Sequence, residues 1–403
     1  MNAPALAPAR ERAFLLTLAA VQVSHIVDFM VMMPLGPFLM QGLGVDTRGF
    51  GLLVAAYSFG AAASGLLAAG FVDRFERKRT LLVLFAAFLV ATLACGLATG
   101  FATLFAARVL AGVFGGILGS LVQTLLADAI PFARRAAAVG FVSTAFSVST
   151  VAGVPLSLWL AEALGWRAPF LAIAALGAAV WLAGCRALPV LDAHRDGVAP
   201  RPPLAAIGGV LADANQRWAL LFSGTLIFSG FVVIPYLTVY SIGNAGVLPG
   251  QIPLIYLLGG LATLFTARRI GHWADRTGKL QAFRRLALAA LAPILLLTHV
   301  GEVGLLGWLP GSLAFFVLVS GRMIPAMALI ASAADPAQRG AAMSLNATVQ
   351  SLAMGAASTL AGFVIAQGAD GRFTGYGEVG WIAVAAGLAA IALAGRVAVR
   401  DAR

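Results

Sequence analysis

Residues 271–279 read Gly-His-Trp-Ala-Asp-Arg-Thr-Gly-Lys and form a charged loop between two long apolar runs. A related stretch, Ala-Gly-Phe-Val-Asp-Arg-Phe-Glu-Arg, occupies residues 69–77, so that Asp73 and Asp275 stand 202 residues apart. In each case a proline lies 39 or 40 residues before the aspartate. The two copies therefore indicate a duplicated unit, and internal repeats with a binding site at their interface are an architecture of transporters.

The sequence around these loops is too apolar for a soluble protein. Of its 403 residues, 61% are hydrophobic and 11% are charged, whereas soluble domains carry about 25% charged residues. Twelve apolar runs are each long enough to cross a bilayer core of about 30 Å as a helix. They cover residues 13–40, 49–72, 80–99, 101–127, 136–163, 166–188, 218–243, 250–270, 282–300, 303–333, 341–367 and 379–398. We therefore predict an all-α polytopic membrane protein.

The formal net charge of +11 reflects topology rather than nucleic-acid binding. If the N-terminus is cytoplasmic, 22 of the 27 Lys and Arg residues fall in cytoplasmic segments, 3 in outward loops and 2 within spans. The positive-inside rule then predicts that both termini are cytoplasmic. Arginine outnumbers lysine 25 to 2, a composition that favours a bacterial origin and hence the bacterial inner membrane.

A polar, proline-rich stretch divides the chain into two halves of six spans each. We predict helical bundles at residues 1–188 and 217–403, related by pseudo-symmetry and joined by a cytoplasmic linker at 189–216. The other loops are too short to hold a soluble active site, and no metal-ligand spacing or phosphate-binding loop is present. Both cysteines, Cys95 and Cys185, lie in apolar runs, so no disulfide or metal cluster is indicated. An enzyme is not expected.

The duplicated loop resembles the signature of the major facilitator superfamily, Gly-x-x-x-Asp-Arg-x-Gly-Arg/Lys. In that family an aspartate can cap a helix and the arginine can pair across bundles. In the first copy Ala69 and Glu76 replace the two glycines, so a less tight turn is expected there than in the family pattern. The matching positions, expected to control the conformational change, are Gly271, Asp275, Arg276 and Gly278 in the second copy and Asp73, Arg74 and Arg77 in the first.

Three further motifs resemble parts of this family. Arg108 begins an Arg-x-x-x-Gly-x-x-Gly pattern similar to the fourth-helix motif of proton-coupled exporters, and Arg322 holds the corresponding place in the tenth span. Gly153 and Pro155 form a Gly-x-Pro pattern similar to that of the sugar-efflux and arabinose-efflux-like members, and the proline should bend its helix. The resemblance implies two bundles rocking about a midplane cavity, a small-molecule substrate, a monomer, and no cofactor besides a coupling proton.

Asp28 alone among the sixteen acidic residues lies near the middle of a predicted span. Burial and a nearby arginine act oppositely on the protonation of a carboxyl group, so such a group can bind a proton on one side of the membrane and release it on the other. We predict that Asp28 couples transport to protons, with Arg108 modulating its charge and His25, one helical turn away, assisting. A static ion pair between Asp28 and Arg108 is the alternative, and Arg108 could instead snorkel to the outer surface.

Apolar side chains near this carboxylate are candidates for the wall of the cavity. They are Phe29, Met32 and Met33, of which the methionines would give an adaptable surface, although helix packing is the more common role of such residues. Arg322 is a second cavity candidate, with a structural bond to a backbone carbonyl as its alternative. The resulting hypothesis is proton-coupled efflux, by antiport, of a drug, sugar or metabolite. The alternative is uptake of a small polar solute by a symporter or uniporter.

Overall fold

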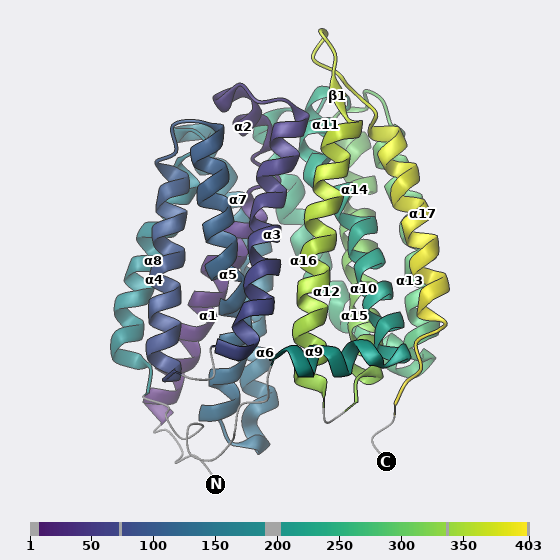
Figure 1. The fold of residues 1–403 in the computed structure, drawn as a ribbon. Coiled ribbons are helices and arrows are strands. Elements are labelled where there is room, and N and C mark those ends of the chain that lie inside the picture. The colour runs from purple at the N-terminus through teal and green to yellow at the C-terminus, as the bar shows by residue number, and fades with distance from the viewer. Residues whose placement is uncertain (1–7, 72–74, 190–202, 336–337, 401–403) are drawn as a thin grey trace.

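The computed structural model describes residues 8–71, 75–189, 203–335 and 338–400, and helices form nearly all of its regular structure (Figure 1). The first half contains α1 (Pro8–Val31), α2 (Gly36–Leu43), α3 (Thr47–Phe71), α4 (Arg77–Gly96), α5 (Phe101–Ala129), α6 (Phe132–Val148), the π-helix η2 (Ser149–Gly153), α7 (Val154–Leu164) and α8 (Ala168–Ala187). A short helix, α9 (Pro203–Ala212), follows. The second half contains α10 (Ala214–Phe231), the 3₁₀ turn η4 (Ile234–Tyr236), α11 (Leu237–Gly243), η5 (Pro249–Gln251), α12 (Ile252–Thr277), α13 (Lys279–His299), α14 (Gly304–Gly321), α15 (Met323–Ala333), α16 (Arg339–Val364), β1 (Ala366–Gln367), β2 (Phe373–Thr374) and α17 (Tyr376–Ala394).

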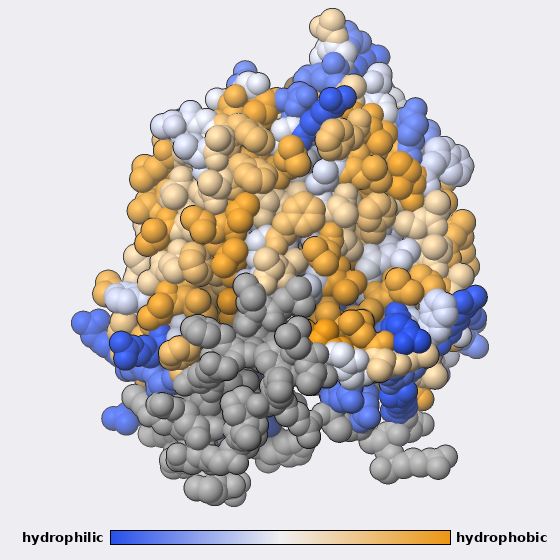
Figure 2. Space-filling model, in the orientation of Figure 1, coloured by the Kyte–Doolittle hydropathy of each residue, from blue (hydrophilic) through white to orange (hydrophobic). Residues whose placement is uncertain are grey.

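These helices account for the predicted membrane spans. Eleven segments of the described chain are long and apolar enough to cross a bilayer, and α3 occupies the place of the remaining span. In Figure 2 apolar residues cover the visible middle of the molecule, while hydrophilic residues gather towards its two ends. Large side chains such as Val90, Leu176 and Phe265 are about two-thirds exposed, as expected of helices whose outer surface contacts lipid (66%, 67% and 67%).

The first span of each half is interrupted at a proline rather than continuous. The run 13–40 is divided between α1 and α2 around Pro34, and the run 218–243 is divided between α10 and α11 around Pro235. A proline lacks the N–H that would continue the helical ladder and clashes with the preceding turn. The two prolines stand 201 residues apart, so the interruptions are related by the repeat.

The two halves lie side by side, with both ends of the described chain on one face of the molecule (Figure 1). We call this the terminus face, and the other, which carries the β1–β2 hairpin, the opposite face. The predicted linker at 189–216 includes α9, whose Pro203 stands in the first helical turn, where a missing N–H has no cost. Val210 of α9 is fully buried in a cluster with Leu220 and Leu345 of the second half. The preceding residues 190–202 lie outside the described chain.

The hydrophobic core joins the halves towards the opposite face and separates towards the terminus face. The largest cluster contains Leu35 and Phe50 of the first half together with Tyr236, Val239 and other residues of the second. The clusters nearer the terminus face each belong to one half, with α9 added to the second. The described conformation is therefore closed between the halves at the opposite face.

Uncharged hydrogen bonds hold this closure. The Thr47 hydroxyl at the start of α3 donates to the Ile365 carbonyl oxygen at 2.5 Å, and the Tyr236 hydroxyl donates to the Thr47 carbonyl oxygen at 2.7 Å. All three residues are buried. Among the described residues of the opposite face, no ion pair joins the two halves; the pair between Arg372 and Glu302 lies within the second half.

The Tyr236→Phe variant is expected to open the opposite face more often. Loss of one hydrogen bond costs about 1 kcal/mol, or roughly fivefold in population. Val239 is 3% exposed, so a cysteine at this position reports the opening. In a protein with Cys95 and Cys185 replaced by alanine, Val239→Cys should react with an impermeant maleimide applied to the opposite face. This reaction should be about fivefold faster in the Tyr236→Phe variant than in the protein that keeps Tyr236. Tyr240→Phe is the matched control, because its hydroxyl bonds Val300 within the second half. Equal rates in both variants would contradict the closure assigned to Tyr236.

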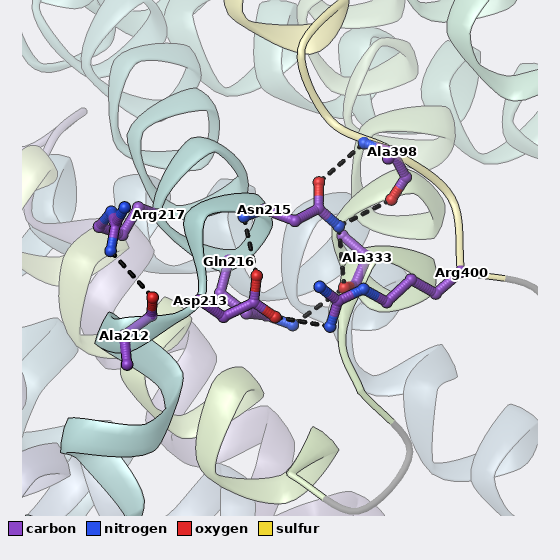
Figure 3. A network of polar contacts seen from close by, with 8 residues as sticks. All are labelled: Ala212, Asp213, Asn215, Gln216, Arg217, Ala333, Ala398 and Arg400. Carbon is purple, nitrogen blue, oxygen red and sulfur yellow. Dashed lines mark hydrogen bonds and ion pairs between the residues drawn. The ribbon is translucent and has the colours of Figure 1, made fainter.

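A strap of chain after α17 crosses the terminus face of the second half (Figure 3). The Asn215 side chain exchanges two hydrogen bonds of 2.8 Å with the backbone of Ala398, and the Arg400 guanidinium pairs with Asp213 at 2.5 Å. The Arg400 N–H donates to the Ser332 carbonyl at the end of α15. The strap thereby ties α17 to the beginning of α10 and the end of α15.

Acid is expected to loosen this strap. Burial of the Asp213 carboxyl works to raise its pKa, but hydrogen bonds from Arg400 and the Asn215 N–H outweigh burial and hold the pKa below its ordinary value. The pairing therefore stabilises the strap above the ordinary pKa of about 3.9 and is lost as the pH falls through the lowered value.

Removal of the same carboxylate should loosen the strap at neutral pH. In Asp213→Asn, amide hydrogen exchange over residues 396–400 should rise by up to about fivefold, the limit for a partly exposed ion pair. Asn215→Ala, which loses both bonds to Ala398, should have the larger effect. Unchanged exchange in both variants would show that neither the Asp213 nor the Asn215 side chain holds the strap.

Candidate functional site

The centre of the first half contains one buried ion pair. Asp28 lies on α1 and Arg108 on α5, and both side chains are completely buried. Nη1 of Arg108 donates to Oδ2 of Asp28 at 2.7 Å and to the Asp28 carbonyl oxygen at 3.3 Å. Because Arg108 is 0% exposed, it does not snorkel to the outer surface, and that alternative is wrong.

Polar and aromatic neighbours complete the surroundings of the pair. The Thr92 hydroxyl on α4 donates to Oδ1 of Asp28 at 3.2 Å. The guanidinium of Arg108 lies 4.8 Å from the ring centre of Tyr57 and 6.0 Å from that of Phe170. Its Nε and Nη2 have no hydrogen-bond partner among the described residues, so the ring faces provide the contacts on that side. Sequence reasoning missed Thr92 and Tyr57, because neither carries a charge or a motif.

Glycines on both helices, Gly60 of α3 and Gly112 of α5, set the distance between α3 and α5. A Cβ atom built on Gly112 would lie 2.0 Å from the Tyr57 carbonyl oxygen, and one built on Gly60 would lie 2.3 Å from the Val109 carbonyl oxygen. The two helices therefore contact each other through their backbones, as small residues permit. This close approach brings the Tyr57 ring beside the guanidinium of Arg108.

His25 lies on α1, one turn before Asp28, but bonds elsewhere. Its Nε2 makes a short hydrogen bond with Oε1 of Gln22, and no hydrogen bond joins it to Asp28 among the described residues. A Cβ atom on Gly119 of α5 would lie 3.9 Å from the imidazole ring. The structure thus brings Asp28 and Arg108 together without His25, whose assisting role stays a prediction.

The predicted cavity candidates are divided among different surroundings. Met32 and Met33 follow α1 and are buried in the cluster that spans both halves (1% and 5% exposed). Phe29 lies 5.3 Å from the Tyr57 ring in its own half and 6.2 Å from the Phe231 ring in the other. In this closed arrangement the three side chains pack against the core; a role as a cavity wall stays a prediction.

Arg322 stands between α14 and α15 and is buried inside the second half. Its Nη2 donates to Oγ of Ser229 at 3.4 Å, while Nε and Nη1 have no partner among the described residues. Ser229 follows Asp28 by 201 residues, the same offset that relates the two helix-breaking prolines. The second half therefore repeats the arginine of the first half but holds a serine in place of the carboxylate.

The two loop motifs differ where their sequences differ. Gly278 ends α12 with φ of +91°, a backbone conformation that favours glycine. Its counterpart, Glu76, has φ of −61° and caps α4 by accepting hydrogen bonds from the N–H groups of Lys78 and Arg79.

The charged residues of the motifs do not all take the positions expected of them. Asp275 and Arg276 lie in the last turn of α12, so Asp275 does not cap the next helix, whose N-cap is Gly278. Gly271 has open space beside it, and Arg77 bonds Asp128 on α5 of its own half at 3.3 Å. Asp73 and Arg74 lie outside the described residues.

Gly153 and Pro155 belong to an irregular part of the fifth span. Residues 149–153 form the π-helix η2, and α7 continues directly from it with Pro155 in its first turn. A Cβ atom on Gly153 would lie 2.4 Å from Cγ2 of Val27, the residue before Asp28. Segments of π-helix inside α-helices are frequent at functional sites, and this one contacts α1 beside the buried carboxylate.

Two bundles of long apolar helices, each with a first span broken at a proline, define a polytopic membrane protein with an internal repeat. Comparison with known families matches residues 18–358 to the Major Facilitator Superfamily. The chain therefore belongs to this superfamily of membrane transporters and is not an enzyme, as the sequence predicted.

Individual relatives and structures agree with this assignment. The MFS-type transporter YtbD of Bacillus subtilis is 25% identical over 325 residues, covering 77% of this chain and 80% of YtbD. A chloramphenicol resistance protein of Streptomyces lividans is 26% identical over 286 residues, covering 68% and 73%. The inward-open structure of the Escherichia coli xylose transporter XylE aligns over 98% of both chains with a TM-score of 0.75 and 16% identity. The predicted fold of twelve spans in two six-helix bundles is confirmed.

Proposed function

We propose that this transporter exports a small organic molecule in exchange for protons, and that Asp28 is the group that carries the proton. The observation behind the proposal is that Asp28 and Arg108 are completely buried and bonded to each other at 2.7 Å. Breaking such a pair by removing one charge costs about 3–5 kcal/mol, because the other charge is left unpaired away from water. Protonation of Asp28 would weaken its bond to Arg108 and release α1.

The proposal uses one carboxylate, in the first half only. Ser229 holds the repeat-related place in the second half and offers no titratable group. A single coupling site makes the two halves unequal. The first half would bind the proton, and the second half would move relative to the first. Closure at the opposite face, with both termini on the other side, corresponds to an inward-facing state if the termini are cytoplasmic.

Export is favoured over uptake by the similarity to the chloramphenicol resistance protein, whose name describes protection from a toxic compound. A monomer in the bacterial inner membrane, with both termini in the cytoplasm, is part of the same proposal. The distribution of arginines supports this orientation, because the positive-inside rule counts charges in short loops.

Transport into proteoliposomes under an imposed pH gradient tests the proposal. Lipophilic cations, sugars and amino-acid-like metabolites would be screened, and the expected result is accumulation of a solute against its gradient, driven by proton flow in the opposite direction. Accumulation that ignores the pH gradient would overturn proton coupling. Cells lacking the protein should become sensitive to a toxic compound; loss of growth on a nutrient would instead show uptake.

A further inference from the structure

A cleft of about 200 Å³ lies between the two halves, away from the buried ion pair. Its walls come from α6 and η2 of the first half and from α12, α14 and α15 of the second. None of the lining residues is charged. Besides apolar side chains, the lining includes five hydroxyl groups, those of Ser147, Thr150, Thr263, Thr266 and Ser320.

The threonine hydroxyls of this cleft are bonded so that they can accept but not donate. Each already donates its hydrogen to a carbonyl of its own helix: Thr150 to Phe146 at 2.9 Å, Thr263 to Gly259 at 2.8 Å and Thr266 to Ala262 at 2.7 Å. A hydroxyl oxygen in this position keeps lone pairs for a further hydrogen bond. A ligand that bonds these three threonine oxygens must supply O–H or N–H groups, whereas the hydroxyls of Ser147 and Ser320 can donate or accept.

One wall of the cleft also touches the helix that carries Asp28. The Thr150 hydroxyl lies 3.9 Å from the Met30 sulfur, two residues after Asp28, and Gly153 packs against Val27, one residue before it. Thr150 belongs to η2, so the same π-helix lines the cleft and contacts α1 on both sides of the carboxylate.

The cleft also changes when the halves move relative to each other. A Cβ atom on Gly260 of α12 would lie 3.1 Å from side-chain atoms of both Thr150 and Val151, so η2 packs directly on the second half at this point. A site with walls from both halves is accessible to different faces as the halves rock. Substrate sites of secondary transporters lie at such repeat interfaces near the midplane.

We propose that this cleft binds the transported molecule, and that this molecule is uncharged, with an apolar body and at least one O–H or N–H group. A charged group would enter the cleft without a counter-charge among its lining residues, at a large desolvation cost. The inference rests on the proposed function only in treating the ligand as the transported solute. Contact of η2 with α1 then links occupancy of the cleft to the state of Asp28.

Alkylation of a cysteine in the cleft tests the binding chemistry. In Ala267→Cys, reaction with maleimide would be followed by mass spectrometry, with the native Cys185 on α8 as the internal reference. The probes are 4-nitrobenzyl alcohol, its methyl ether, 4-nitrobenzoate and 4-nitrobenzylammonium, which share one body and differ in donor and charge. The alcohol should slow alkylation about threefold at twice its Kd. The ether, the benzoate and the ammonium should have little effect.

Two hydroxyl deletions identify the groups that bind the donor. Thr150→Val and Thr266→Val should each reduce protection by the alcohol, measured as the ratio of each variant's own alkylation rates without and with the alcohol. Thr225→Val is the matched control, because its hydroxyl bonds the carbonyl four residues earlier in the same way but lies outside the cleft lining. Equal protection by the alcohol and the ether would overturn the proposal that the cleft recognises a hydrogen-bond donor. Equal protection by the alcohol in the three threonine variants would overturn it as well.

The remaining outcomes separate this inference from the proposed function. Alkylation is measured without a proton gradient, so a failure of proton coupling leaves it unchanged. If transport is proton-driven but the alcohol does not protect Ala267→Cys, the proposal that the cleft binds substrate is wrong and the proposed function stands. If alkylation is blocked in phosphatidylcholine nanodiscs while the alcohol has no effect on it in detergent, the cleft is occupied by lipid and the inference is wrong.

Discussion

Proteoliposomes that contain the Asp28→Asn variant are expected to show no accumulation of substrate driven by a pH gradient. Asparagine keeps the shape of the side chain but cannot bind and release a proton at physiological pH. Downhill exchange of substrate should persist in the folded variant, because no residue that lines the cleft between the halves is substituted. The measurement is substrate accumulation with and without the gradient, and Asp28→Glu, which restores a titratable carboxyl group, should recover part of the proton-driven signal.

The asparagine variant alone leaves Arg108 buried without its partner, at a cost of about 3–5 kcal/mol that could prevent folding. The double variant Asp28→Asn/Arg108→Gln removes both charges and provides the second test. If the double variant folds, binds substrate and still drives it uphill with an unchanged pH dependence, the pair is a static structural link. Thermal unfolding of each variant separates loss of coupling from loss of fold.

The Gly112→Ala substitution is expected to destabilise the protein although alanine favours helices. Its Cβ atom would lie 2.0 Å from the Tyr57 carbonyl oxygen, so α3 and α5 would have to move apart. Overpacking of this kind costs about 1–3 kcal/mol. The displacement would also move Tyr57 away from Arg108, whose guanidinium lies 4.8 Å from the ring centre.

Gly140→Ala on α6 is the matched control, because no atom lies within 4 Å of its added Cβ. Removal of a helical glycine there should be neutral or stabilising by about 0.5–1 kcal/mol. The melting temperature in detergent should therefore fall for Gly112→Ala and stay level or rise for Gly140→Ala. A Gly112→Ala protein as stable as the wild type would show that the helices separate without cost.

The architecture could be predicted from sequence because it depends on long patterns. Apolar runs of about 20 residues and a duplicated loop are patterns over many positions, so they can be recognised even where single residues depart from them. The interruptions after Val31 and Phe231 were not predicted, although the prolines that cause them were recognised. Helix α9 was missed because the proline-rich residues before it suggested a linker without structure.

Only the charged residues of the candidate site could be predicted from sequence. Asp28 and Arg108 stand out as ionisable residues in apolar spans, so their pairing could be anticipated from sequence. Thr92 could not, because a threonine in an apolar helix carries no signal until α4 is placed against α1. The cleft was missed for the same reason: its five hydroxyls come from α6 and η2 of the first half and from α12 and α14 of the second, and each one alone resembles an ordinary helix residue.

The absence of charge from the bonds at the opposite face has a consequence for the environment in which the protein works. At 0.1 M, dissolved ions largely screen interactions between exposed charges that lie more than about 10 Å apart, but they hardly affect buried neutral hydrogen bonds. The bonds of Thr47 and Tyr236 are of the second kind. The contribution of these two bonds to the closed state should therefore be nearly the same in fresh water and in brine, whereas the contact of the Arg48 guanidinium with the Phe363 ring, 5.4 Å away in the other half, involves a charge.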